Sequence, residues 1–576
     1  MNKNVVILIL LALLLTSCTP KVTEPIKIEN PDVLPIGAVD NAKITDLKEI
    51  YSADDETSVV SMYLTVMRGN KADNTDHSWS DVNANPIFYY EDIGVDPYAV
   101  EGLLQVGDEN GPTEGLLGYG KTTPNAVVTL RGRTSSRGRQ KSYKINIKKD
   151  MGKWREQSVI SLNKHIYDPS RFRNKLSYDL LKTIPDTFSA RTQFVRLYVK
   201  DLSESGSASA GFVDYGLYTQ VEQINTTYLR THALDENGYL YKANMFEFLR
   251  YTDDIKLTAD PGYDELKFAY RMESKGNPDH SRLIEMLDEL NNYSVPIEET
   301  FEKYFDRDNY FTWLAFQMLT GNVDTTSQNF FLYCPGNSNK WHFISWDNDG
   351  GWGGRFVVSR NRASEYNFTL GVGNYWNSVL HQRVLRSSEY RNILSEKVEE
   401  LKAKLSPEFI TEYTTKYSEV VRPFVYSAPD LANAQVSAGD YNRILGLMNT
   451  EIDYNYEMYK QSLKKPMPFF IDQPIMVGEQ IAFNWETAYD FDGSRIHYTF
   501  ELSRDYRFQS VISKQDGLVI PQATVNKLPS GEYFCRVTAT NAAGEIQTAM
   551  EIYTNAASED FYGVRAFYVN GEGGIE

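Results

Sequence analysis

Three carboxylates and one carboxamide are spaced along a single stretch of the sequence so that they could share one site. Asp324 precedes Asn329 by five positions, and Asp347 and Asp349 follow after two apolar segments joined by a polar turn. Carboxylate and amide oxygens are the ligands that hard divalent cations prefer. A carboxylate beside a hydroxyl can also accept its proton. The residue types are therefore those needed to hold a divalent cation and to activate a hydroxyl.

The elements between these residues predict how they are positioned. The apolar segments FFLY and WHFISW flank the turn PGNSNK and have similar lengths, so they predict a β-hairpin. Such a hairpin returns Asp347 to the neighbourhood of Asn329. Protein kinases use the same order of parts, an Asp, four residues, an Asn, two strands and an Asp, to place a base and metal ligands.

Two alternatives stay open at this point. A single Asp-x-x-x-x-Asn spacing is common in long chains, so Asp324 and Asn329 could do no more than cap turns after a helix. Asp349 could be a second metal ligand or a structural anchor for the turn.

A basic segment lies upstream of the acidic one. Residues 131–149 contain eight Lys or Arg residues and no Asp or Glu, with Gly and Ser in the middle. Backbone N–H groups, hydroxyls and guanidinium groups are what a polyphosphate requires. The segment therefore predicts a phosphate site, although a solvated strand face that carries scattered charge remains the alternative.

Apolar periodicity predicts the surrounding elements. Alternating segments predict strands at 58–68, 126–133, 141–149, 192–200 and 211–224. Helical spacing predicts a helix within 168–185 and a buried helix before Gly321. The Gly-, Asn- and Asp-rich residues 69–120 predict long loops with short strands.

Five segments, RGRTSSRGRQKSYKINI, RFRNKLSYDLL, YGLYTQVEQI, GNVDTTSQNFFLY and WHFISWDNDGGWGG, resemble the CotH spore-coat kinase-like family in residues and in order, over about residues 58–430. The resemblance implies an atypical, diverged protein-kinase-like domain. Together with the C-terminal β-sandwich that the later strand pattern predicts, the expected fold class is α+β. It also implies a bound ATP with Mg²⁺ or Mn²⁺ and phosphorylation of protein Ser or Thr hydroxyls.

The same resemblance assigns roles to individual residues. Asp324 corresponds to the catalytic base, and Asn329 and Asp347 correspond to metal ligands, with Asp349 a further candidate ligand. The residues expected around the nucleotide are Arg131, Arg133, Arg137, Lys141, Lys144 and Glu222. Of the two lysines, Lys144 lies on the strand and Lys141 nearer the Gly/Ser loop, and either could hold phosphate. Glu222 would orient that lysine or be a simple strand residue. The loop is one residue longer than the family's usual RG-x-SSR, which changes the side chains that face the ligand.

The N-terminus indicates export. Residues 1–17 resemble a bacterial lipoprotein signal peptide, and Cys18 would be the lipidated first residue of the mature protein. An uncleaved anchor is the alternative. Residues 18–56 are polar and predict a tether. We therefore expect a lipid-anchored protein of the bacterial cell envelope, in the outer membrane or at the cell surface.

The remaining domain boundaries follow from changes in composition and in the strand pattern along the sequence. Residues 57–465 form the predicted kinase-like domain, 466–556 resemble a fibronectin type III β-sandwich, and 557–576 are expected to be a tail. Cys334 and Cys535 are far apart and predict two buried thiols rather than a disulfide.

Charge and composition narrow the function classes. The formal charge of −18 argues against nucleic-acid binding, and the chain lacks the HExxH and GxSxG motifs of metalloproteases and serine hydrolases. The expected partners are a nucleotide and an envelope protein or glycan. Because little ATP is expected outside the cytoplasm, a non-catalytic surface protein that retains the kinase-like fold for binding or assembly is the alternative.

Overall fold

A closed β-sheet forms the first part of the computed structural model, which describes residues 43–204, 211–353, 366–572 and 574–576. The eight strands run in the order β1-β7-β8-β6-β5-β4-β2-β3, and β1 also pairs with β2, which closes the sheet into a barrel. The strands are β1 (Val59–Met67), β2 (Ala99–Asp108), β3 (Gly111–Pro112), β4 (Ala126–Arg131), β5 (Ser142–Ile147), β6 (Val159–Asn163), β7 (Thr192–Asp201) and β8 (Val213–Glu222). All pairs are antiparallel except β1–β7.

Alternation of side chains gives the barrel two different faces. Every second residue points inward into a closed apolar core that includes Leu64, Leu104, Ile145 and Leu197. The outward residues of β5, β6 and β8 include Lys144, which therefore lies on the outer face. The expected strands are found, but the expectation of loops at 69–120 is wrong, because β2 is a long strand and the helices α2 (Trp79–Ala84) and α3 (Ile87–Ile93) precede it.

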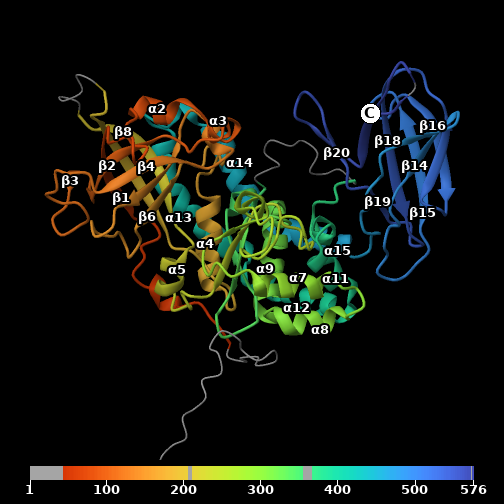
Figure 1. Cartoon of the computed structure of the whole chain (residues 1–576), viewed down its shortest axis with the longest axis horizontal. Helices are drawn as coiled ribbons and strands as arrows, with labels where there is room; N and C mark the ends of the chain where they lie inside the picture. The colour runs from red at the N-terminus through yellow and green to blue at the C-terminus, as the bar shows by residue number, and fades with distance from the viewer. Residues whose placement is uncertain (1–42, 205–210, 354–365, 573) are drawn as a thin grey trace, which may run out of the picture. The chain divides into compact units, whose positions relative to one another are not determined.

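A second, smaller sheet and a set of helices form the next part of the chain. The strands β9 (Tyr239–Ala243), β10 (Met272–Ser274), β11 (Phe330–Cys334) and β12 (His342–Ser345) are antiparallel in the order β10-β9-β11-β12. The helices are α4 (Arg173–Thr183), α5 (Thr226–Thr231), α6 (Glu265–Arg271), α7 (Ser281–Leu290), α8 (Ile297–Tyr304), α9 (Arg307–Thr320), α11 (Val379–Arg386), α12 (Ser388–Lys404), α13 (Pro407–Val425), α14 (Ala438–Asn449) and α15 (Glu451–Ser462). Helices α7, α8, α9, α11 and α12 gather in the green and teal part of Figure 1.

Helix α9 is the centre of this helical part and leads directly into the candidate site. Asp306 caps its start by accepting a hydrogen bond from the backbone N–H of Asn309, and Gly321 ends it in the left-handed conformation, with φ 66°. The residues from Asn309 to Thr320 are all buried. The expected buried helix that ends at Gly321 is therefore confirmed.

The prediction of a tether is wrong for residues 43–56. From Lys43 onward the chain is part of the folded body: Lys43 Nζ lies 2.7 Å from Asp186 Oδ1, and Asp46 Oδ1 lies 2.6 Å from Nδ1 of the buried His232. The sequence pattern does not reveal specific polar contacts of this kind. The signal peptide and Cys18 lie outside the described residues.

The C-terminal part contains two sheets that share one apolar core. One sheet has the order β13-β14-β17 and the other β16-β15-β18-β19, with β22 also paired to β18. The strands are β13 (Ile475–Val477), β14 (Gln480–Asn484), β15 (His497–Ser503), β16 (Val511–Leu518), β17 (Gln522–Asn526), β18 (Gly531–Thr540), β19 (Ile546–Thr548) and β22 (Val564–Val569). A separate pair joins β20 (Ile552–Thr554) to β21 (Asp560–Tyr562). These strands are drawn in blue in Figure 1.

The expected C-terminal tail is therefore wrong in part, because β22 belongs to the second sheet and pairs with β18 from Arg536 to Gly531. The fibronectin type III assignment stays a prediction. Cys334 and Cys535 are both free and buried, as expected. None of the helices among the described residues is long and apolar enough to cross a membrane.

Candidate active site

The β11–β12 hairpin brings Asn329 and Asp347 to the same end. Phe330 pairs with Ser345 in the ladder, and the backbone N–H of Trp346 donates to the Asn329 carbonyl at 3.2 Å. Asn329 therefore precedes the first paired residue of one strand, and Asp347 follows Trp346 on the other. The hairpin folds as the sequence predicts.

Both residues have an uncommon backbone conformation. Asn329 has φ 62° and Asp347 has φ 51°, and the nearby His165 has φ 48°. Non-glycine residues rarely adopt positive φ, although Asn, Asp and His tolerate it best. Such residues cluster at functional sites, where the surrounding structure holds them in place.

The segment that follows Asp347 is fixed mainly by helix α4. The backbone N–H of Asp347 donates to the Tyr178 hydroxyl at 3.2 Å, and that of Asn348 donates to Asn174 Oδ1 at 3.1 Å. The Trp352 indole donates to Ser177 Oγ at 2.9 Å. Three side chains on one helix therefore set the position of the turn that carries Asp347.

Asp324 lies beside the same turn. It belongs to the short 3-10 helix η4 (Val323–Thr325), immediately after α9. A Cβ atom on Gly350 would lie 3.3 Å from Asp324 Oδ2 and 2.8 Å from Asn322 Oδ1. Asn322 is itself held by Gln317, whose carboxamide oxygen accepts its side-chain N–H at 3.0 Å. The glycine thus leaves room for the Asp324 carboxylate next to the Asp347 turn.

Electrostatics distinguish Asp347 from an ordinary surface carboxylate. Surrounding protein atoms withdraw the carboxylate from water, and the negative charge of Asp349 acts in the same direction, so the pKa of Asp347 rises to about 6 even though part of the side chain reaches solvent. The positive charges of Arg131, His165 and Lys242 oppose this rise. His165 Nδ1 lies 3.9 Å from Asp349 Oδ2.

The residues fit a divalent cation that arrives with a polyphosphate. The carboxylates of Asp347 and Asp349 repel each other, and a cation between them would relieve this repulsion. Asn329 adds a carboxamide at the same end of the hairpin. Within the described ranges, no three His, Cys, Asp or Glu side chains are placed to hold a metal ion by themselves. Mg²⁺ is usually held by one or two carboxylates together with substrate phosphates. A shared site of that kind matches this donor set better than an all-protein cage.

Of the two candidate lysines, Lys144 is the one that faces the small sheet. It pairs with Ser161, which pairs with Val221, so these three residues share the outer face of the barrel. Val221 packs in one apolar cluster with Phe331 of β11. Lys141 instead donates to the Ser136 carbonyl at 2.6 Å, within its own loop.

The basic loop divides into two groups of arginines. Arg131 lies near the acidic turn: its guanidinium carbon is 5.9 Å from the Trp346 ring, and the charges of Asp347 and Asp349 act on it. Arg133 and Arg137 stack on the Phe88 ring, at 4.8 and 4.0 Å, and Arg133 also pairs with Glu91. Arg131 therefore lies near the site, as expected. The expected phosphate contacts of Arg133 and Arg137 are wrong, because both side chains pack against α3.

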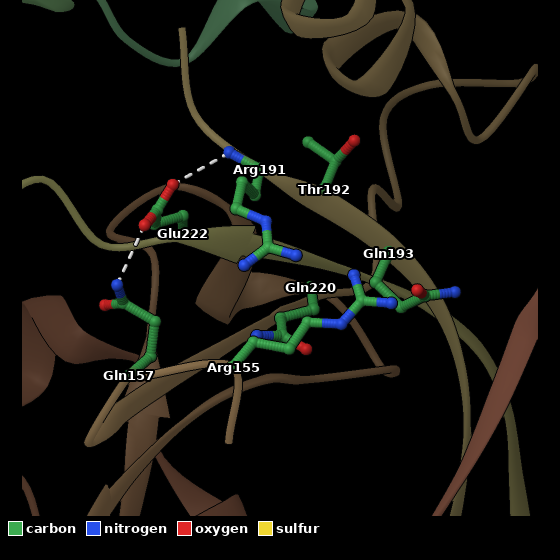
Figure 2. Close-up of a pocket in the computed structure, with 7 residues that line it drawn as sticks. All are labelled: Arg155, Gln157, Arg191, Thr192, Gln193, Gln220 and Glu222. Atoms are coloured by element: carbon green, nitrogen blue, oxygen red, sulfur yellow. Dashed lines mark hydrogen bonds between the residues drawn. The ribbon is translucent and has the colours of Figure 1, made fainter. Parts of the chain in front are cut away.

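Glu222 does not pair with the lysine that it was expected to orient. Glu222 lies two residues after Gln220 and four after Tyr218 on β8, so its side chain faces inward as theirs do. Lys144 points outward. Figure 2 shows its carboxylate between the Arg191 backbone N–H, at 2.9 Å, and the Gln157 amide, at 2.8 Å, beside a cavity of about 10 Å³.

The remaining partner of Glu222 is His232, which it shares with Asp46. His232 Nε2 lies 3.0 Å from Glu222 Oε2, and Nδ1 lies 2.6 Å from Asp46 Oδ1. Burial alone would lower the pKa of His232, but the two carboxylates raise it to about 9. Glu222 is therefore a structural residue that helps to hold the N-terminal segment, and the earlier assignment is corrected.

Sequence reasoning missed four residues that border the site. His165 lies in the loop after β6, and Lys242, Glu273 and Lys275 come from β9 and the end of β10. The close spacing of Glu273 and Lys275 after an apolar residue was a weak signal for a short charged strand. Nothing in the sequence indicated that this strand would pair with β9 across an insertion of about thirty residues.

Comparisons with known proteins agree with this region of the chain. A family model described as CotH kinase protein matches residues 128–462. The inner spore coat protein H of Bacillus subtilis (strain 168) is 24% identical over 325 residues, which are 56% of this chain and 83% of that protein. The family match covers more than half of the chain and includes every candidate site residue from Arg131 to Asp349. The chain belongs to the CotH kinase protein family.

Proposed function

We propose that the protein is an ATP- and divalent-cation-dependent phosphotransferase with an atypical kinase-like fold, which transfers phosphate to a Ser or Thr hydroxyl of an envelope protein. The observation that carries the proposal is the convergence of Asp324, Asn329 and Asp347 at one hairpin end, opposite Lys144 on the barrel. The order of these residues and their strands is the order in which protein kinases place a base and metal ligands.

The residues divide the work by chemistry. Asp324 accepts the hydrogen bond of the acceptor hydroxyl and, in the transfer, its proton. Asn329 and Asp347, with Asp349 beside them, would supply oxygen ligands for a Mg²⁺ or Mn²⁺ ion, and such an ion would neutralise charge on the phosphates. Lys144 and Arg131 hold phosphate oxygens from the barrel side. Asn329 and Asp347 are both held in the left-handed backbone conformation at this end of the hairpin, so their positions are set before the substrate arrives.

Location and acceptor belong to the same proposal. The lipoprotein signal and Cys18 support attachment to the bacterial envelope, so the acceptor would be an exported protein or a surface glycan. The phosphate donor would have to be present outside the cytoplasm. The alternative, a surface protein that retains the fold without turnover, makes the same prediction for nucleotide binding but not for transfer.

Two measurements on the purified full chain test the proposal. ATP with Mg²⁺ or Mn²⁺ at a hundredfold its dissociation constant should stabilise the protein by about 2.7 kcal/mol in a thermal-shift assay. Labelled phosphate should then pass from ATP to the chain or to envelope proteins, and Asp324→Asn should abolish transfer while nucleotide binding persists. Binding without transfer in the wild type would favour the non-catalytic alternative. Transfer at the wild-type rate by Asp324→Asn would rule out the proposed base.

A further inference from the structure

A compact cluster of charges on β9 and β10 lies beside the site. Glu273 Oε1 lies 3.1 Å from Lys242 Nζ, and its other oxygen lies 2.6 Å from Lys275 Nζ. Asn244 donates to Glu273 Oε1 at 3.2 Å. Burial would raise the pKa of Glu273, but the two lysines and these hydrogen bonds lower it to about 2. One carboxylate thus holds two ammonium groups in fixed positions.

The register places this cluster on the face of the small sheet that turns towards the barrel. Lys242 is paired with Phe331 and lies two residues after Leu240 on the same face, and both apolar residues pack in a cluster with Val221 of β8. Val221 shares the outer barrel face with Lys144. The two sheets therefore carry Lys144 and Lys242 on faces that turn towards each other.

Electrostatic coupling supports this placement. Burial is the main cause that lowers the pKa of Lys144. The charge of Lys275 lowers it further, and the charge of Glu273 raises it. The cluster thus lies within reach of the barrel lysine.

The side chains remain available to a ligand. Lys242, Glu273 and Lys275 keep 27%, 33% and 34% of their side-chain surface exposed. A surface ion pair contributes little stability, so two lysines held by one carboxylate are poorly explained as a stabilising device. Glu273 instead keeps two like charges close together in the absence of an anion.

The charges around the site favour an anion once a divalent cation is bound. Arg131, Lys144, Lys242 and Lys275 are positive, and Glu273, Asp324, Asp347 and Asp349 are negative, so the charges of these side chains balance. A divalent cation at the acidic turn would leave about two net positive charges, which phosphate oxygens would offset.

We propose that Lys242 and Lys275, positioned by Glu273, form one side of a polyphosphate site, the second wall, and that Lys144 and Arg131 on the barrel form the other side. This rests on the proposed function, of which it specifies the donor's phosphate contacts. Charge-assisted hydrogen bonds from both walls fix the chain of phosphates in line with the acidic turn.

The test uses inorganic tripolyphosphate with Mg²⁺ as the probe, titrated calorimetrically into the purified full chain. Lys242→Met and Lys275→Met should each weaken binding roughly tenfold or more, since a hydrogen bond to a charged group contributes about 1.5–3 kcal/mol. Lys242→Arg keeps the charge and should retain affinity within about threefold. Lys267→Met, an exposed lysine on α6 between the two strands, is the matched control and should bind as the wild type does.

The outcomes separate this inference from the proposed function. If the wild type does not bind tripolyphosphate, or if both methionine variants bind it as tightly as the wild type, the second wall is refuted even where phosphate transfer from ATP is observed. If the methionine variants lose tripolyphosphate while no transfer from ATP can be detected, the polyphosphate site stands and the phosphotransferase proposal falls. Unfolding temperatures of all variants, measured in parallel, exclude a general loss of structure as the cause.

Discussion

The contact of His232 with Asp46 and Glu222 predicts a strong dependence of local stability on pH. The imidazole is fully buried and hydrogen-bonded to a carboxylate on each side, so both ring nitrogens donate and the ring is positively charged. Raising the pH removes this proton and leaves two carboxylates facing a neutral ring. We expect the N-terminal segment from Lys43 to Tyr51 to loosen as a result.

The magnitude follows from the rise of the His232 pKa from 6.5 to about 9. Because the folded-state value lies above the unfolded value, the contribution is fully present below pH 6.5 and is lost as the pH rises through about 9. The whole contribution is about 3 kcal/mol, of which about 2 kcal/mol is lost between pH 7 and pH 9. Burial would raise the pKa of Asp46, but His232 lowers it. The shifts of Asp46 and His232 arise from the same contact, so they represent a single contribution to stability.

Two assays measure the effect. In a chain with labelled histidine, one of the seven histidines should titrate near pH 9 by NMR. Native-state hydrogen exchange, corrected for intrinsic rates, should show the free energy of opening of residues 43–51 falling from pH 7 to pH 9. The fall should not exceed about 2 kcal/mol, because Glu222 still faces His232 when only this segment opens. Asp46→Asn is the matched control, because it removes one of the two charges that retain the proton and should flatten this dependence.

Two results would refute the reasoning. His232 titrating below pH 7 would mean that burial outweighs the two carboxylates. An equal loss of opening free energy in the wild type and in Asp46→Asn would assign the pH dependence to other groups.

Three further predictions concern the site. Asp347→Ala should abolish the stabilisation of about 2.7 kcal/mol that ATP and Mg²⁺ provide at a hundredfold the dissociation constant; an unchanged thermal shift would remove Asp347 from the metal ligands. Gly350→Ala should lower turnover roughly tenfold to a hundredfold with little change in nucleotide affinity, because its Cβ would lie 2.8 Å from Asn322 Oδ1 and 3.3 Å from Asp324 Oδ2 and would shift the segment that carries Asp324; a wild-type rate constant would show that this segment can adjust without moving the carboxylate. Glu222→Gln should lower stability by about 2 kcal/mol and leave ATP affinity unchanged; a selective loss of affinity would restore the kinase-type pairing with a lysine.

Local sequence signals were sufficient for the parts of the fold whose contacts are close in sequence. Helix α9 and its stop at Gly321, and the hairpin that carries Asn329 and Asp347, follow from periodicity, a glycine and a short turn. The inward or outward direction of each strand residue also follows from alternation once the register is known. These features place the acidic half of the site.

Contacts between distant segments could not be predicted in the same way. The closure of the barrel by β1 and β2, and the pairing of β10 with β9, depend on register across long loops. The direction of Arg133 is decided by Phe88 and Glu91, which lie more than forty residues earlier in the chain. Glu222 was misassigned because its strand position alone does not reveal that His232 and Asp46 lie beside it.

Barrel closure has a practical consequence for truncation. The family match begins at residue 128, inside β4, and so leaves out both β1 and β2. A fragment cut at that boundary would leave the edges of β7 and β4 unpaired and would uncover inward side chains such as Val195 and Leu130, which β1 and β2 help to enclose. Open edges beside bare apolar surface favour intermolecular strand pairing. If such a fragment is insoluble, the cause would be the loss of β1 and β2 rather than instability of the family domain.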